Sequence, residues 1–361
     1  MSASHHLSLS ATPSGRVRFD AAINPYGCSP RVVAALHDAV EARAYRHYGD
    51  IDAASLRTAL GAHHGLAPEN FVVYPGSGQA HVWQCIARLM LPRGVFLCPF
   101  PSYERFVEVG RRCARAIEEV PLEPGSWALP VDAFLAAARK HDGALAMISN
   151  PNNPTGNVLV DGPRLEALLT GAPHCTFVID EAYAEYTGRT FAPWVARFPN
   201  LIVLKTFSKA YGLAGLRVGY LVAHHKVAAA AGALQIPWAV DTLALVAAEA
   251  ALDDQAYLRQ VVGQIGADVE ALGAALNRFA FARVNPAEAN FVLCELPEGT
   301  AAPVAARLEE RGLVVRRRPD LPNAMRITSM LPDDNRRLLA ALETVLGPRA
   351  AGAGVESAVR R

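Results

Sequence analysis

The sequence predicts an α/β protein with a large domain built on a mostly parallel sheet and a smaller α+β domain. Short apolar runs alternate with amphipathic stretches over most of the 361 residues, and the runs are rich in Val, Ile and Leu. Such runs are typical of strands that helices cover on both faces. After residue 236 the pattern changes to long Ala- and Leu-rich stretches followed by short strand-like runs, which indicates a second domain.

The expected elements follow in chain order. Buried strands are expected at FVVYP (71–75), GVFLC (94–98), ALAMIS (144–149), CTFVID (175–180) and LIVLK (201–205), and helices at YERFVEVGRRC (103–113) and VDAFLAAARK (131–140). Long helices are expected at 243–252 and 257–279, followed by a small sheet from ANFVLCEL, GLVVRRR and AMRITSM with two helices. We therefore expect an N-terminal arm at 1–30 that joins the small domain, a large domain at 31–236, a small domain at 237–347 and a disordered tail at 348–361.

The composition limits the classes of function. Thirty-five basic and thirty-four acidic residues leave a net charge of +1, so no global field favours nucleic acid or an anionic membrane. No stretch of about 18 apolar residues occurs, and the N-terminus lacks the pattern of a secretory leader, so we expect a cytoplasmic protein. The six cysteines show no CxxC pairing or regular spacing, which favours free buried thiols over disulfides or zinc. No metal site is expected.

One lysine stands in an unusual setting. Lys209 follows the apolar run LIVLK and lies between Ser208 and a Gly-rich turn that ends in Arg217. A lone lysine is ordinarily a solvated surface charge, whereas this placement indicates an amine held for covalent chemistry. Upstream, Asp180 ends the run CTFVID and would emerge at the carboxyl edge of the sheet, where α/β proteins bind ligands. A helix N-cap would also explain that aspartate taken alone.

The turn NPNNPTG (150–156), Asp180 and TFSKAYGLAGLRVGY (206–220), in this order, resemble the fold-type I enzymes that use pyridoxal 5'-phosphate (PLP). These sequence motifs are similar to those of the aminotransferase class I/II family, in its histidinol-phosphate aminotransferase and threonine-phosphate decarboxylase branch. The resemblance runs from about Asn24 to about Leu346. The resemblance implies a fold-type I PLP-dependent transferase. It implies that Lys209 forms the aldimine and moves the proton at Cα, that Asp180 keeps the pyridine nitrogen protonated, and that Tyr183 and Asn153 donate to the phenolic oxygen.

The cofactor phosphate needs a cradle. The segment PGSGQAHVWQCIARLM (75–90) follows an expected strand and opens an expected helix, so the amides of Gly78, Gln79 and Ala80 are candidates. It is no dinucleotide fingerprint, because His81 stands where GxGxxG needs its third glycine. The resemblance adds Thr206, Ser208 and Arg217 to the cradle. It also makes Tyr103 the aromatic residue that stacks on the pyridine ring, although the residue type alone would place it in the core.

The resemblance extends to the partner subunit and the substrate. Tyr48 in YRHYGD matches a tyrosine that reaches the cofactor phosphate of the partner, which implies a homodimer with shared active sites. Arg326 matches the arginine for the α-carboxylate, Arg316 matches a second anion position, and Asn24 and Asn153 lie where substrate is enclosed. Surface salt bridges are the alternative for Arg316, Arg317 and Arg318, and we expect it to hold for two of the three.

We expect an aminotransferase that moves an amino group between a small amino acid or amino-alcohol phosphate and a 2-oxo acid. Two alternatives stay open: a threonine-phosphate decarboxylase of cobalamin side-chain biosynthesis, and a non-catalytic PLP-fold binding protein. The decarboxylases are resembled more closely by INPYG and IPWAVDTLALVAAEAAL. The aminotransferases are resembled more closely by SKAYGLAGLRVGY, and the His-Gly-Gly segment of many decarboxylases is absent. Gln79, Ala80 and His81 replace a usual acid and His47 replaces a usual arginine, which leaves the substrate open.

Overall fold

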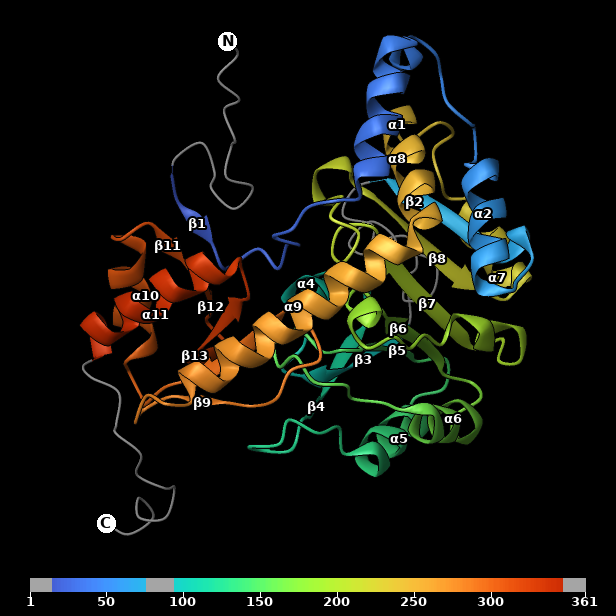
Figure 1. Cartoon of the computed structure of the whole chain (residues 1–361). Helices are drawn as coiled ribbons and strands as arrows, with labels where there is room; N and C mark the ends of the chain where they lie inside the picture. The colour runs from blue at the N-terminus through green and yellow to red at the C-terminus, as the bar shows by residue number, and fades with distance from the viewer. Residues whose placement is uncertain (1–14, 76–93, 347–361) are drawn as a thin grey trace, which may run out of the picture.

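The computed structural model describes residues 15–75 and 94–346, and its centre is a seven-stranded sheet (Figure 1). The strand order is β2-β8-β7-β6-β5-β3-β4. Strand β8 runs antiparallel to both neighbours, and the other neighbouring strands are parallel. The bounds are β2 Phe71–Pro75, β3 Val95–Phe100, β4 Ala116–Pro121, β5 Leu145–Ser149, β6 Thr176–Asp180, β7 Leu201–Thr206 and β8 Val218–Ala223. The predicted mostly parallel sheet is confirmed.

Helices cover both faces of this sheet. Alternate strand residues point to opposite sides, so each face carries apolar side chains that helices bury. Val73, Ile179 and Val203 pack on one side with helices α1 (Pro30–Glu41), α2 (Ala54–His64), α5 (Val131–Lys140), α6 (Gly162–Gly171) and α8 (Thr242–Asp253). On the other side Tyr74 and Leu204 pack with α4 (Glu104–Cys113) and α7 (His225–Gly232). Burial on both faces explains why the strands read as continuous apolar runs.

Three of these helices begin at side-chain caps. Ser29 accepts a hydrogen bond from the Arg31 amide, Asp161 from the Arg164 amide, and Asp241 from two amides at the start of α8. Proline also occupies the first turn of α1 and α6, where its missing N–H has no cost.

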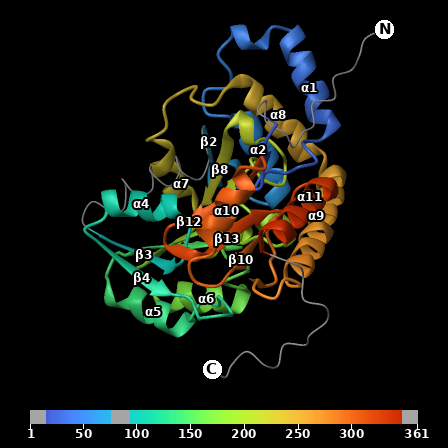
Figure 2. The same cartoon turned by 90° about the vertical axis from the view of Figure 1, so that its left-hand side faces the viewer.

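A second core surrounds a four-stranded antiparallel sheet of order β12-β13-β10-β9 (Figure 2). Its strands are β9 Arg283–Val284, β10 Phe291–Glu295, β12 Arg316–Arg318 and β13 Leu321–Thr328, and its helices are α10 (Ala301–Glu309) and α11 (Pro332–Leu346). Strand β1 (Val17–Arg18) pairs in parallel with β11 (Leu313–Val314). Val17 and Phe19 are buried here, so the described start of the chain packs in the second core.

Helix α9 (Gln255–Leu276) passes from one core to the other (Figure 1). Leu258 belongs to the first core, whereas the buried residues from Val261 onward belong to the second. Helix α8 packs its Ala- and Leu-rich face in the first core, against α1 and the sheet. The hydrophobic core therefore changes within α9 and not at residue 237, where we expected the domain boundary.

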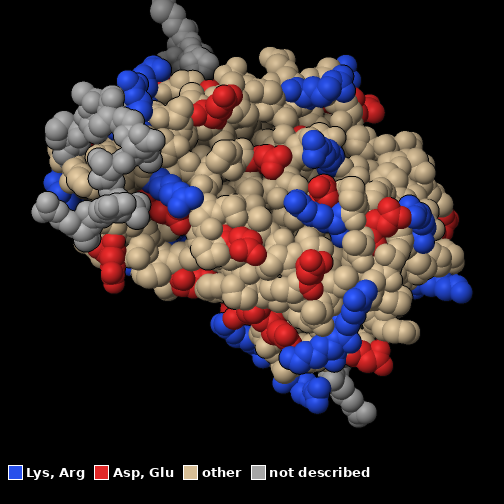
Figure 3. Space-filling view, turned by 90° about the horizontal axis from the view of Figure 1, so that it is seen from below, with Lys and Arg blue, Asp and Glu red and all other residues tan. Residues whose placement is uncertain are grey.

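Short 3-10 helices complete the chain at η1 Ala44–Arg46, η2 Pro68–Asn70, η3 Ala184–Tyr186, η4 Ala192–Ala196 and η5 Ala214–Leu216. Among the described helices none is long and apolar enough to cross a membrane. Basic and acidic side chains are interspersed on the face that Figure 3 shows. The cradle residues Gly78, Gln79 and Ala80, the expected tail and the first part of the expected arm lie outside the described residues.

Candidate active site

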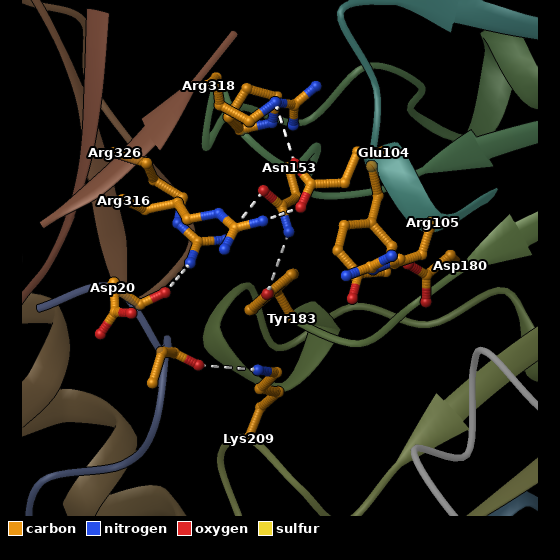
Figure 4. A pocket seen from close by; sticks show the side chains of 13 residues that line it. Asp20, Glu104, Arg105, Asn153, Asp180, Tyr183, Lys209, Arg316, Arg318 and Arg326 are labelled. Carbon is orange, nitrogen blue, oxygen red and sulfur yellow. Dashed lines mark hydrogen bonds and ion pairs between the residues drawn. The ribbon is translucent and has the colours of Figure 1, made fainter. Parts of the chain in front are cut away.

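A cavity of about 240 Å³ lies between the two cores, where β5, β6 and β7 end (Figure 4). Asp180 is the last residue of β6, Asn153 follows β5, and Lys209 follows β7. The small sheet supplies the opposite wall. The lining residues are Asp20, Ala21, Tyr103, Glu104, Arg105, Asn153, Pro154, Asp180, Tyr183, Lys209, Arg316, Arg318 and Arg326.

Lys209 projects its amine into this cavity. Its Nζ donates a 3.3 Å hydrogen bond to the carbonyl oxygen of Ala21 and lies 5.6 Å from the centroid of the Tyr183 ring. Burial and then the nearby Arg326 and Arg217 charges lower the pKa of Lys209 to about 7, although Asp180 opposes the shift. An amine with this pKa is partly neutral at neutral pH, so Lys209 can act as a nucleophile.

Asp180 presents a buried carboxylate at the strand end. The residue is 2% exposed, and its Oδ2 accepts a hydrogen bond of 3.1 Å from the hydroxyl of Ser149. Its Oδ1 accepts from the amide of Ala182 at 3.2 Å. Ser149 is the last residue of β5, and Ala182 lies two residues after the end of the neighbouring strand β6, so the two strand ends fix the orientation of the carboxylate.

Two phenols line the cavity in their neutral form. Burial raises the pKa of Tyr183 well above the usual range, and burial followed by the Asp180 charge raises the pKa of Tyr103. The hydroxyl of Tyr183 lies 3.5 Å from Nδ2 of Asn153, which donates to it. Tyr103 precedes α4 and packs edge-on against Phe106, at a centroid distance of 4.9 Å. Tyr183 can therefore donate to a ligand oxygen, and Tyr103 offers a ring held in place.

Arg326 is a buried cation that faces these groups. Its Nη1 donates to Oδ1 of Asn153 at 3.0 Å, and its Nη2 donates to the carbonyl oxygen of Asp20 at 2.5 Å. Its Nε is buried without a hydrogen-bond partner, and burial lowers the pKa of the guanidinium. Since buried N–H groups are normally paired, this arginine is suited to a charge-assisted bond with an anionic ligand.

The loop after β7 supports Lys209 from behind the cavity. The amide of Ser208 donates to Oγ1 of Thr206 at 3.1 Å, and Nη1 of Arg217 lies 3.5 Å from Oγ of Ser208. Arg217 has a left-handed backbone, with φ of 56°. Thr206, Ser208 and Arg217 are thus adjacent to Lys209, although they do not line the cavity.

The N-terminal segment closes over this loop. Nδ2 of Asn24 donates to the carbonyl oxygens of Ala210 at 2.8 Å and Gly27 at 3.0 Å, so its side chain binds the loop and not the cavity. Gly212 has φ of 76°, and a Cβ there would lie 2.7 Å from the backbone of Gly27. Only glycine allows so close an approach at this φ.

Of the predicted site residues, the structure brings Lys209, Asp180, Tyr183, Tyr103, Asn153, Arg316 and Arg326 to one cavity. Tyr48 lies elsewhere: it is 86% exposed, and its ring is 5.4 Å from that of Trp238. Sequence reasoning missed the lining residues Asp20, Ala21, Glu104 and Arg105, and assigned two of the three arginines Arg316–Arg318 to surface salt bridges. Arg318 is buried, and its ion pairs are with Glu104 and Asp320. A clue to Glu104 was present, because it directly follows Tyr103.

These groups fit a cofactor that carries an aldehyde on a pyridine ring. The amine of lowered pKa suits the aldehyde, the carboxylate suits a protonated pyridine nitrogen, the neutral donors suit a ring oxygen, and the fixed aromatic side chain suits the face of the ring. The fold and the site define an enzyme that holds such a cofactor on a lysine. The chain matches the family described as aminotransferase class I and II over residues 15–342. It belongs to this family, and it is an aminotransferase that uses pyridoxal phosphate.

Relatives and solved structures agree with this assignment. The histidinol-phosphate aminotransferase of Roseiflexus castenholzii is 36% identical over 340 residues, which cover 91% of this chain and 89% of that protein. The structure of the histidinol-phosphate aminotransferase of Sinorhizobium meliloti with pyridoxal-5'-phosphate has a TM-score of 0.83 and 27% identity, over 91% of this chain and 89% of that chain. The L-threonine-O-3-phosphate decarboxylase of Porphyromonas gingivalis has a TM-score of 0.79 and 27% identity, over 90% and 98%.

Proposed function

We propose that the enzyme transfers the amino group of an amino-alcohol phosphate such as histidinol phosphate, or of a small amino acid, to a 2-oxo acid. The observation that carries this proposal is the placement of Lys209, with its pKa of about 7, in one cavity with the buried Arg326. Aminotransfer requires a base at Cα and an anchor that fixes the substrate anion. Relatives named as histidinol-phosphate aminotransferases support the choice of substrate.

Five residues of the cavity have roles toward the cofactor in this proposal. Bound PLP would supply an electron sink for the bond at Cα that stands perpendicular to its ring. Lys209 would bind the cofactor covalently and, when substrate displaces it, would take the proton from Cα. Asp180 would hold a proton on the pyridine nitrogen, and Tyr183 and Asn153 would donate to the phenolic oxygen. Tyr103 would cover one face of the ring.

Phosphate and substrate binding complete the assignment. Thr206, Ser208 and Arg217 would bind the cofactor phosphate, together with the amides of Gly78, Gln79 and Ala80, which lie outside the described residues. Arg326 would bind the α-carboxylate or phosphate of the substrate and would so orient Cα that its proton is exposed to Lys209. Arg316 would bind a second anion, and Asn24 would hold the arm that closes over the substrate.

We also propose that two copies of the chain form a homodimer with shared active sites. Eight large apolar side chains are exposed in two segments, 33–51 and 234–238, and we call them the apolar patch. They are Val33, Val40, Tyr45, Tyr48, Ile51, Leu234, Ile236 and Trp238. A 3.1 Å hydrogen bond from the amide of Trp238 to the carbonyl oxygen of Ile51 holds the segments together. Apolar patches of this kind mark interaction surfaces, and Tyr48 within it would reach the partner's cofactor phosphate.

A substrate panel tests the proposed reaction. Holoenzyme is incubated with histidinol phosphate, threonine phosphate and single amino acids, while the aminated cofactor and carbon dioxide are measured separately. We expect histidinol phosphate or an amino acid to give the aminated cofactor, and a 2-oxo acid to convert it back to the aldehyde form. Carbon dioxide from threonine phosphate, with no aminated cofactor from any amine, would establish the decarboxylase that the structural similarity keeps as the alternative.

A further inference from the structure

The cavity wall contains an anion of its own beside the arginines. Glu104 is the first residue of α4 in the large domain, and its carboxylate forms ion pairs with Arg316 and Arg318 of β12 in the small domain (Figure 4). The distance from Oε2 of Glu104 to Nε of Arg318 is 3.2 Å. One carboxylate therefore joins two arginines across the cavity.

The two arginines differ in how much they depend on Glu104. The Arg318 side chain is 3% exposed; it binds Asp320 through Nε at 2.8 Å and Nη2 at 2.6 Å, and it donates to the carbonyl oxygen of Ser102 at 2.7 Å. It is thus fixed whether or not Glu104 is present. The Arg316 side chain is 40% exposed, and the ion pair that the structure gives it is the one with Glu104. Of the two, Arg316 is available to a ligand.

We propose that Glu104 determines substrate specificity: it occupies Arg316 as an internal anion, which the second anionic group of a dianionic substrate must displace. This proposal rests on the proposed function, in which Arg316 binds that group. When Glu104 is displaced from Arg316, it keeps an ion-pair partner, because its other carboxylate oxygen is paired with Arg318. Uncharged substrate side chains leave the Glu104–Arg316 pair intact. The preference of the enzyme for dianionic over monoanionic substrates is therefore weaker than it would be without Glu104.

Binding of two matched ligands to holoenzyme tests this role. The probes are glutarate, with two carboxylates, and its monoamide glutaramate, with one; calorimetry gives their Kd without turnover. We expect Glu104→Gln to bind glutarate about tenfold more tightly than wild type, the order of one charge-assisted contact, while glutaramate changes less than about twofold. Glu309→Gln removes an exposed carboxylate paired with Arg16, neither of which lines the cavity, and should bind both ligands as wild type does. Unchanged or weaker glutarate binding, or equal changes for both ligands, would overturn the proposal.

Two further measurements separate the possible failures. In an Arg316→Gln background, Glu104→Gln should give no gain for glutarate, since the arginine that it liberates is absent; a gain that persists contradicts the mechanism. Glu104→Ala should behave as Glu104→Gln does, so the outcome does not depend on the fold of one variant. With turnover, the ratio of kcat/KM for glutamate to that for glutamine should rise about tenfold in Glu104→Gln. If neither amino acid reacts, the substrate panel decides the proposed function, and the calorimetry still decides the role of Glu104.

Discussion

Arg326 donates a 3.0 Å hydrogen bond to Asn153, and this contact joins strand β13 of the small sheet to the loop after β5 of the large sheet. The amide nitrogen of the same asparagine lies 3.5 Å from the hydroxyl of Tyr183. One side chain thus connects the arginine proposed for the substrate anion with the phenol proposed for the cofactor. We therefore expect a change at Asn153 to affect both the substrate anion site and the cofactor site.

Replacement of Arg326 should impair substrate use far more than cofactor binding. We expect Arg326→Gln to lower kcat/KM at least about a hundredfold, since a charge-assisted bond to a buried anion is lost and a planar fork cannot be replaced. Arg326→Lys should recover only a small part. The control is Arg283→Gln in β9 of the same sheet, whose arginine is 62% exposed in its side chain. Steady-state kinetics with bound-cofactor absorbance make the measurement; equal losses in both readouts would indicate a structural role instead.

Lys209 should be the lysine that carries the cofactor. Its amine is the one that lines the cavity, and no other lysine is among the lining residues. Borohydride reduction of holoenzyme followed by peptide mapping should recover the pyridoxyl group on Lys209. Lys205 is a matched control, because it is buried four residues earlier but is held in ion pairs with Glu181 at 3.1 Å and Glu185 at 2.9 Å. Label on Lys205 or any other lysine would exclude Lys209 as the covalent site.

Covalent capture of the cofactor by apoenzyme should depend on pH with a midpoint near 7. Because the pKa of Lys209 is lowered to about 7, the reactive neutral amine increases as pH rises through that value and is complete above it. The capture rate should rise about tenfold per pH unit below the midpoint and level off above it. Arg326→Gln removes a cation that contributes to the shift, so its midpoint should move upward. A wild-type rate that still climbs at about pH 9 would mean an ordinary lysine.

Periodicity alone predicted much of the sheet, because strands buried on both faces give continuous apolar runs. It missed β8, which begins directly after the Gly-rich turn that ends in Arg217, and β4, in which three of the six residues are half-buried and two are exposed. The domain boundary was expected at residue 237 because the long helices begin there. The Ala- and Leu-rich sequence of α8 does not say which core the helix joins, and its packing against α1 and the large sheet decides it.

The site was predicted less evenly. Lys209 and Asp180 follow directly from strand ends, since parallel strands bring their carboxyl ends to one edge. Asp20 and Ala21 could not be predicted in this way, because their place depends on the pairing of β1 with β11, about 300 residues later in the chain. Glu104 was missed for a related reason: its partners Arg316 and Arg318 belong to the other domain.

Loss of Arg217 should weaken retention of the cofactor. Its guanidinium lies 3.5 Å from the hydroxyl of Ser208, beside Lys209, where a phosphate would receive both donors. A lost charge-assisted contact to a dianion is worth about 1.5 to 3 kcal/mol, so Arg217→Ala should raise the Kd for PLP at least about tenfold. Arg164→Ala on the surface of α6 is the control, since that side chain is 52% exposed. Equilibrium dialysis makes the measurement, and an unchanged Kd would remove Arg217 from the phosphate site.

The proposed shared active site makes a prediction that a monomer could not satisfy. Tyr48 is 86% exposed and lies outside the cavity of its own chain, in the apolar patch, so any role in catalysis requires a second copy. Lys209→Ala chains should be inactive, and Tyr48→Phe chains should be weakened about tenfold through loss of one bond to a charged group. In the proposed dimer, mixed chains would form heterodimers in which one site carries both lesions and the other carries neither. Mixing should therefore raise activity above the sum of the separate variants.

Tyr45→Phe, also in the patch and 60% exposed, is the control and should gain nothing on mixing. Activity that stays at the sum, or a fully active monomer in sedimentation, would refute the shared site.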